Sequence, residues 1–221
     1  NKAVFGTGDI RILNNGMLII GGANNVAAGA TVLVADQGYG GGLQFAGDYL
    51  PKIDPASSGT LILETTAYAN GNLDKAFSST TTPIGNGQMY LGAAGAASYY
   101  GSSLAALVAN DPTHTYKFGG GLNANLQVGA SRASGGVLTN LNGQSHNVVA
   151  GKPGIWGENY PQQVRLTDAN SYSGETTVNR GTTLLAYGHQ NGSGLGTASG
   201  GVTLNGYGQN LYASLWYTAY S

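Results

Sequence analysis

Short apolar strings recur along the chain, and glycine, asparagine or aspartate bounds most of them. They are rich in Val, Ile, Leu, Thr and Tyr, a composition typical of β-strands between turns. Their spacing, often 6–12 residues, is shorter than strand–helix–strand units need. The pattern therefore predicts an all-β chain. The predicted strands are Ile10–Leu13, Met17–Ile20, Thr31–Ala35, Leu43–Ala46, Thr60–Glu64, Gln88–Leu91, Thr115–Phe118, Asn123–Val128, Gly136–Leu141, Gln163–Leu166, Thr176–Val178, Thr182–Ala186, Val202–Leu204 and Ser214–Tyr217.

The residues between the strings favour a solenoid. Many are Asn-Gly, Asn-Asn or Gly-Gly pairs, such as Asn142-Gly143 and Asn205-Gly206, and these residues tolerate the left-handed backbone of sharp corners. Segments 12–36 and 164–188 also share one pattern of apolar strand, Ala-Asn, small corner and Thr-rich strand. Such self-similarity predicts coils that bury their faces against one another. A β-sandwich with long polar loops is the alternative.

The segment 92–112 differs from the rest. Its residues Leu104, Leu107 and Val108 recur at helical spacing, which predicts one short helix near 102–109. We expect this helix to cover a patch of core, and 92–112 is a candidate inserted lobe. A binding role for the lobe is the alternative.

Composition limits the classes of function. The 221 residues include no cysteine, 38 glycines and only 9% charged residues, where a soluble domain has about 25%. The net charge of −1 offers no basic field for nucleic acid, and no apolar run approaches the roughly 18 residues of a membrane helix. We expect one solenoid domain over 1–221, which is a mature chain or an excised piece of a longer one.

The segment 164–206 carries a more specific pattern. The pieces that carry it are Leu166-Thr167, Ala169-Asn170, Tyr172-Ser173-Gly174, Thr176-Thr177-Val178-Asn179, Gly181-Thr182, Leu184-Leu185, Leu195-Gly196 and Val202-Thr203-Leu204-Asn205-Gly206. With these pieces the segment resembles the autotransporter-associated β-strand repeat, which occurs in the passenger regions of large bacterial surface proteins. The stretch His-Thr-Tyr-Lys-Phe-Gly-Gly-Gly at 114–121 is similar to one that often precedes such repeats.

The resemblance implies a right-handed parallel β-solenoid, exported and displayed outside a bacterial cell. Alternation along each strand then separates interior from exterior positions. We expect the interior to hold Val178, Leu184, Val202 and Leu204. We expect the exterior to hold Thr177 and Thr203.

The acidic residues are scattered, which argues against catalysis. General acid–base chemistry needs two groups that converge on one bond, and no two acids lie within five residues of each other. Folding would have to bring together pairs such as Asp36 with Glu64 or Asp9 with Asp168. Segment 36–42 has the glycine density of a calcium-binding β-roll but lacks its second aspartate. The histidines are too far apart in the sequence for a typical zinc site, so we expect no metal. Because the acids are scattered, we also expect no catalytic residues and no cofactor.

Tyrosine dominates the aromatic residues, with 14 tyrosines against 4 phenylalanines. Tyrosine is amphipathic and suits half-exposed faces and recognition. The candidate contacts for a partner or a glycan are Tyr99, Tyr100, Tyr207, Tyr212, Trp216, Tyr217 and Tyr220. Stacking of rings from coil to coil is the alternative role. Segment 207–221 has no charge and no proline, which predicts an edge strand that needs a partner.

These observations together predict a non-enzymatic, structural or adhesive β-solenoid that is extracellular or on the bacterial cell surface. Two alternatives stay open: a subunit of a homopolymeric filament that assembles head-to-tail through terminal strands, and a polysaccharide-processing β-helix enzyme. The expected partners are another copy of the chain, or a host or cell-surface glycan or protein. Nucleic acid and membrane insertion are not expected.

Overall fold

The computed structural model describes most of the C-terminal half of the chain and shorter pieces of the N-terminal half. The described residues are 10–12, 17–19, 32–34, 42–45, 59–63, 87–93, 95–99, 103–109, 111–120, 125–130, 135–153, 162–190, 192–197, 199–206 and 212–219.

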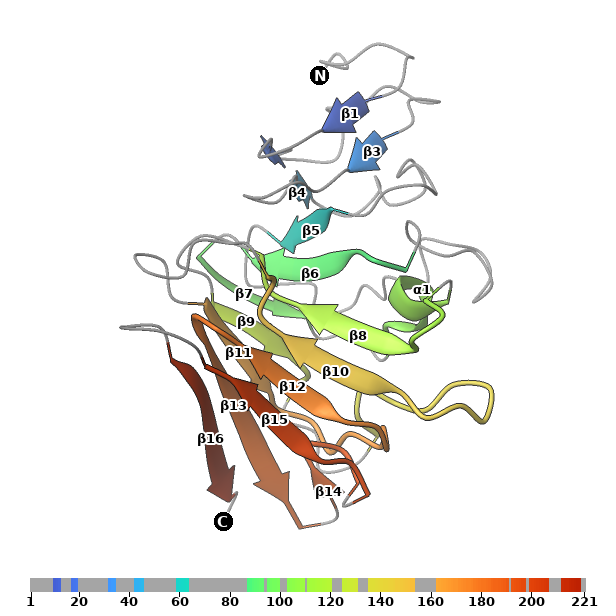
Figure 1. Cartoon of the computed structure of the whole chain (residues 1–221), viewed down its shortest axis with the longest axis vertical. Coiled ribbons are helices and arrows are strands. Elements are labelled where there is room, and N and C mark those ends of the chain that lie inside the picture. The colour runs from blue at the N-terminus through green and yellow to red at the C-terminus, as the bar shows by residue number, and fades with distance from the viewer. Residues whose placement is uncertain are drawn as a thin grey trace.

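Strands account for nearly all of the regular structure in these residues (Figure 1). They are β1 (Ile10–Ile12), β2 (Met17–Ile19), β3 (Val32–Val34), β4 (Gly42–Phe45), β5 (Thr60–Leu63), β6 (Tyr90–Ala93), β7 (Ala96–Tyr99), β8 (Thr115–Phe118), β9 (Asn125–Val128), β10 (Asn147–Ala150), β11 (Gln162–Leu166), β12 (Thr176–Asn179), β13 (Thr182–His189), β14 (Gly192–Ser193), β15 (Val202–Asn205) and β16 (Ala213–Ala219). One helix, α1, spans Ala105–Val108.

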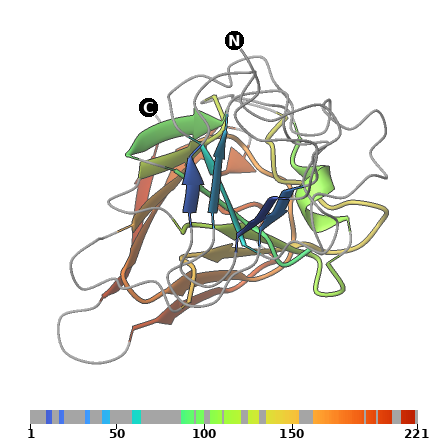
Figure 2. The same cartoon turned by 90° about the horizontal axis from the view of Figure 1, so that it is seen from above.

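The strands form two long sheets that the chain visits in turn. One sheet has eight strands in the order β15-β12-β10-β8-β6-β5-β4-β2, and the other has the order β14-β13-β11-β9-β7 with β16 also paired to β13. β1 and β3 form a separate pair. Every pairing of these strands is parallel except that of β13 with β14. Since each strand pairs with strands one coil away, the chain winds as a parallel β-solenoid, which confirms the predicted fold (Figure 2).

Residues of successive coils lie in register along the stack. In the eight-stranded sheet, one column of aligned positions runs from the first strand of the sheet to the last. The column consists of Leu18, Leu43, Leu61, Leu91, Phe118, Ala150, Val178 and Leu204. From Leu61 to Val178 its side chains are fully buried. The interior of the solenoid is therefore a continuous apolar core along the stack.

Asparagine side chains connect the coils at the corners. Asn170 accepts a hydrogen bond from Leu138 N (3.1 Å) on the coil before it and donates one to Gly194 O (2.9 Å) on the coil after it. Asn179 donates to Gly151 O (2.8 Å), and Asn205 donates to the side-chain oxygen of Asn179 (3.2 Å). These bonds satisfy corner groups that no strand pairing reaches, so they join each coil to its neighbours.

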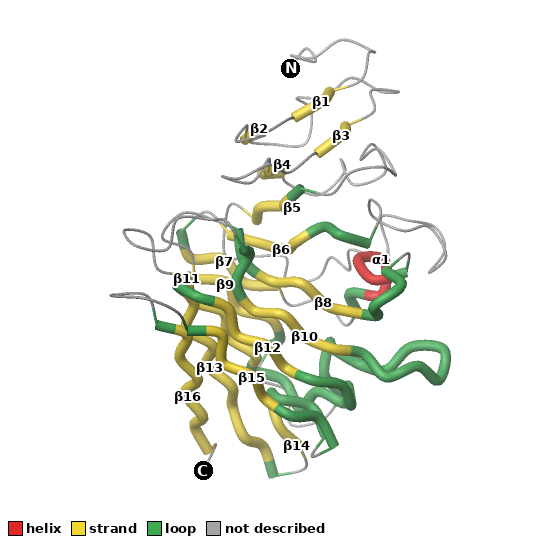
Figure 3. The backbone as a smooth tube through the Cα atoms, in the orientation of Figure 1, coloured by secondary structure: helices red, strands yellow, loops and turns green. Residues whose placement is uncertain are grey.

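The helix lies where the sequence predicted one, and it is short. Leu104 and Leu107 are buried in the core cluster, and Ser103 Oγ accepts a hydrogen bond from Ala105 N (3.1 Å). Segment 92–112 also contributes β7, which pairs with β9. The helix therefore covers core beside the sheets (Figure 3).

Several strand predictions need correction. The predicted strand Gly136–Leu141 is wrong, because these residues form irregular corner structure, where Gly136 N donates to Ala169 O (3.0 Å). β7, β10 and the two-residue β14 were not predicted. β7 consists mainly of small residues, and the polar residues before β10 resemble a loop. β7 has little strand propensity of its own and is held by its pairing with β9, whereas the Val148-Val149 pair of β10 itself favours a strand.

Candidate functional site

Asp111 and Lys117 are buried charged residues that pair with each other. Asp111 accepts hydrogen bonds from Thr113 N (2.9 Å), Thr113 Oγ1 (2.8 Å) and Thr115 N (3.2 Å), and its carboxylate pairs with Lys117. Lys117 also donates to Gly87 O (2.8 Å). Burial by itself raises the pKa of Asp111, but the bonds from Lys117 and Thr113 outweigh it and hold the pKa below its usual value. The bond from Lys117 to Gly87 O thus joins two coils inside the solenoid.

His146 is also an internal residue. Its ring lies 5.3 Å from that of His114 and 5.5 Å from that of Tyr116, and its Nδ1 lies 2.9 Å from Gln144 O. Burial lowers the pKa of His146 below its usual value, which favours the neutral imidazole. The side chain closes the base of the 139–146 loop, where Asn140 Oδ1 accepts a bond from His146 N (3.0 Å).

The acid pairs considered from the sequence contain one described member. Asp168 is fully buried, and its Oδ1 accepts a hydrogen bond from Ala130 N (2.8 Å). Asp9, Asp36 and Glu64 lie outside the described residues. Within the described part of the chain, no group of three or more His, Cys, Asp or Glu residues could hold a metal ion. The large apolar and aromatic side chains that are exposed among the described residues lie at the C-terminal end of the stack.

The last coil leaves apolar interior positions open to solvent. Val202 and Leu204 are aligned with the fully buried Thr176 and Val178 of the coil before. Yet Val202 is 41% exposed and Leu204 is 49% exposed. The sequence predicted that both face inward, and the register agrees. β15 is the last strand of the eight-stranded sheet among the described residues, so no described coil covers these two side chains.

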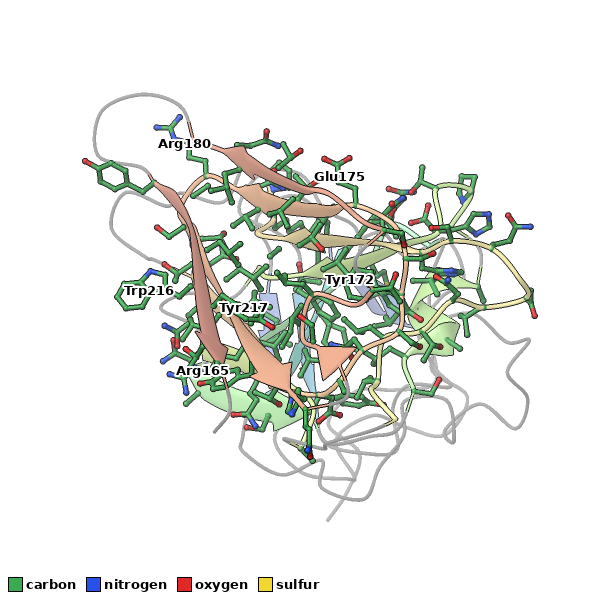
Figure 4. The ribbon with its side chains drawn as sticks, turned by 90° about the horizontal axis from the view of Figure 1, so that it is seen from below. Arg165, Tyr172, Glu175, Arg180, Trp216 and Tyr217 are labelled. Carbon is green, nitrogen blue, oxygen red and sulfur yellow. The ribbon has the colours of Figure 1, made fainter. Side chains whose placement is uncertain are left out.

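β16 extends this open face onto the second sheet. Its inner positions Leu215 and Tyr217 are aligned with Leu184 and Ala186 of β13. Tyr217 is 54% exposed, and its ring lies over Gly188, where an added Cβ would come within 2.6 Å of the phenolic oxygen. Figure 4 looks onto this end of the stack and shows Tyr217 on the inner side of β16. We call Val202, Leu204, Leu215 and Tyr217 the end face.

The outer side of the same sheet carries a second feature. Gln127, Arg165, Leu185 and Trp216 are aligned across β9, β11, β13 and β16. Trp216 is 65% exposed and lies on the outer side of β16 (Figure 4). Arg165 Nε donates to Gln163 Oε1 (2.6 Å), which orients the guanidinium along the sheet surface. We call these four aligned residues the outer row.

The candidate aromatic contacts have different locations. Tyr99 is fully buried and its hydroxyl donates to Ser103 O (2.6 Å), so it is a core residue and not a surface contact. Tyr212, Trp216 and Tyr217 are exposed. Tyr100, Tyr207 and Tyr220 lie outside the described residues.

Sequence reasoning missed two parts of this region. It did not single out Gln127 and Arg165, because they join Trp216 only through the register of strands far apart in the sequence. It also did not foresee that Val202 and Leu204 are exposed. The alternation of apolar and polar residues in 202–205 was the available signal, and it gives the direction of a side chain but not what covers it.

The fold defines the chain as a parallel β-solenoid, and its last described coil exposes the end face and Trp216 of the outer row. No protein-family model, curated protein or solved structure matches the chain significantly. Among the helical residues described, none forms a segment long and apolar enough to cross a membrane.

Proposed function

We propose that this chain is a non-enzymatic, structural and adhesive β-solenoid of a bacterial surface protein, and that the outer row is its adhesive surface. The observation that supports the adhesive role is the alignment of exposed Trp216 with Arg165 and Gln127 on one face of the sheet. An exposed indole stacks on the apolar face of a sugar ring, and guanidinium and amide groups hydrogen-bond its hydroxyls. A neutral glycan suits this row because Arg165 is its only charged member.

The structural role is supported by how the interior polar groups are used. The side-chain oxygen and nitrogen of Asn170 both form hydrogen bonds with neighbouring coils. The charges of Asp111 and Lys117 neutralise each other inside the core. A general acid or base has to reach a substrate atom within hydrogen-bond distance. These buried groups face each other, so the arrangement favours a scaffold over an enzyme.

The proposed location rests on the resemblance of 164–206 to autotransporter-associated repeats. The absence of cysteine and the scarcity of charge are compatible with an exported scaffold. The sequence is instead rich in Asn, Thr, Ser and Tyr. These features support a place outside the cell.

The adhesive role is tested by binding of the purified chain to immobilised mannan, chitin and peptidoglycan. We expect saturable binding to at least one of them, and at least tenfold weaker binding for Trp216→Ala and Arg165→Ala. Tyr212→Ala removes another exposed aromatic outside the outer row and is the matched control. No binding by the wild-type chain, or equal binding by all variants, would overturn the adhesive role.

The non-enzymatic assignment has its own test. The chain is incubated with the same polysaccharides and with pectin and alginate, and reducing ends and unsaturated products are measured. We expect neither to form above the level of a heat-denatured sample. Product release that is lost in Asp168→Asn would identify an enzyme instead.

A further inference from the structure

The loop before β10 projects from the side of the stack and has a tight turn at its tip (Figure 1). The two central residues of the turn have a left-handed backbone, with φ +52° for Asn142 and +73° for Gly143. Across them, Gln144 N donates a hydrogen bond to Leu141 O (2.9 Å). Two positive φ values between bridged residues are typical of a type I′ turn, which favours the Asn-Gly pair.

The side chain of Asn142 and the backbone amide of Gly143 are both accessible. The two residues are exposed, and a Cβ at Gly143 would meet no atom within 4 Å. In the part of the chain that the structure describes, neither the Asn142 side chain nor Gly143 N makes a hydrogen bond. Solvent therefore reaches both groups, and the side-chain amide can rotate without losing a contact.

Other asparagines near this loop are held by their side chains. Asn140 Nδ2 donates to Ser173 Oγ (2.8 Å), and the Asn170 side chain bonds the coils on both of its sides. An amide held in this way has to break its hydrogen bonds before its carbon can turn towards the backbone nitrogen of the next residue. Asn142 has no such bonds to break, which distinguishes it from these two residues.

We propose that Asn142 is a modification site, at which the side-chain amide is lost by spontaneous deamidation. Gly143 N attacks Cγ of Asn142, the bond from Cγ to Nδ2 breaks, and ammonia leaves with the proton from Gly143 N. The product is a five-membered cyclic imide between the two residues. Water then opens the ring at one carbonyl to give aspartate or at the other to give isoaspartate. Glycine has no side chain to hinder the attack.

The isoaspartate product changes the backbone of the turn. Its backbone runs through the former side chain and is longer by one methylene, so the bond from Gln144 N to Leu141 O is disrupted. Leu141 packs partly against the core, and Leu141 N and Gln144 O both lie near His146 Nδ1. The modification therefore loosens the base of the loop as well as its tip. This inference does not depend on the proposed adhesive role.

Mass spectrometry of the aged protein tests the site. The folded chain is incubated at mildly alkaline pH in isotopically labelled water, and its proteolytic fragments are analysed. We expect the fragment that contains Asn142 to exchange its amide for one labelled oxygen, as a mixture of aspartate and isoaspartate. Asn142→Gln should abolish this change, because glutamine would have to form a less favourable six-membered ring. An Asn142 amide that persists in the folded chain would overturn the proposal.

A second Asn-Gly pair in the same molecule separates the effect of the fold from that of the dipeptide. Ser171→Gly places glycine after Asn170, whose side chain is held, and the backbone nitrogen at 171 donates to Leu138 O (2.9 Å). We expect this asparagine to convert at least roughly tenfold more slowly than Asn142 in the folded variant, and at a similar rate in urea. Equal rates in the folded variant would overturn the structural basis of the site. If the variant does not fold, the wild-type measurement decides.

Amide hydrogen exchange tests the effect on the loop. The isoaspartate form is separated by chromatography and compared with the unmodified chain and with Asn142→Asp. The Asn142→Asp variant carries the same added charge on a backbone of normal length, and aspartate tolerates the left-handed conformation. We expect faster exchange at Gln144 N in the isoaspartate form alone. Equal exchange in all three forms would refute the opening of the turn.

Discussion

Val178 and Leu204 occupy adjacent positions of one column, yet Val178 is fully buried and Leu204 is half exposed. The same holds on the second sheet for Leu184, which is fully buried, and Leu215, which is only partly buried. The sequences of the two coils are equally apolar at these positions. Burial in this fold therefore comes from the neighbouring coil and not from the coil that carries the residue. The interior coils and the terminal coil should respond differently to equivalent substitutions.

The largest difference is expected for leucine truncation. Leu184→Ala leaves a cavity between Val164 and Leu215 and should lower the free energy of unfolding by about 3 kcal/mol. Leu204→Ala removes a half-exposed side chain and should cost about 1 kcal/mol or less. Urea unfolding of dilute protein measures both. Equal losses would show that the terminal coil is as well covered as the interior.

The asparagines that link coils give the second difference. Asn170→Ala leaves Leu138 N and Gly194 O without their partner in a buried corner, which should cost about 2 kcal/mol. Asn205 makes its bond to Asn179 at the exposed end, and Asn205→Ala should change stability by no more than about 0.5 kcal/mol. Thermal and urea unfolding of the two variants side by side checks this ranking. A larger loss for Asn205→Ala would contradict it.

Alanine substitutions at two glycines should show the same difference in stability between interior and terminal coils, with a smaller effect. Gly129 has φ +106°, and a Cβ there would lie 2.5 Å from the carboxyl carbon of buried Asp168. Gly129→Ala should therefore cost more than about 1 kcal/mol. Gly188→Ala meets the far end of the Tyr217 side chain, which can rotate into solvent, and should cost less. Amide hydrogen exchange should show faster opening of β9 and β11 in the first variant alone.

The smallest effect is the titration of His146 near neutral pH. Its pKa is lower in the folded chain than the ordinary 6.5, so the folded state holds fewer protons than the unfolded state. Its contribution to stability is complete above pH 6.5 and is lost as the pH falls through the folded value. Unfolding free energies measured from pH 7.5 to 5.0 should decrease accordingly. His146→Gln should remove this slope, whereas Leu204→Ala at the terminal coil should keep it.

The sequence was sufficient for the fold and only partly sufficient for the site. Apolar strings and Asn-Gly corners identified most strands and the stacked coils, because strand pattern and corner chemistry are local properties. β7 was missed since pairing with β9 holds its small residues in strand conformation, whereas β10 was missed although its Val148-Val149 pair favours a strand. Tyr99 was placed at the surface although its position in the stack is interior. The outer row requires the register of β9, β11, β13 and β16, which depends on corner lengths that sequence patterns do not fix.

The direction of the interstrand hydrogen bonds determines how this solenoid responds to force. The bonds between coils run along the long axis, from β2 towards β15 (Figure 1). Tension between the two ends of the stack loads these bonds along their own direction, so the bonds of one coil break before those of the next. Extension should then proceed as a series of small steps, each releasing the length of one coil. The stack would yield gradually under shear flow and would absorb mechanical work over a long distance.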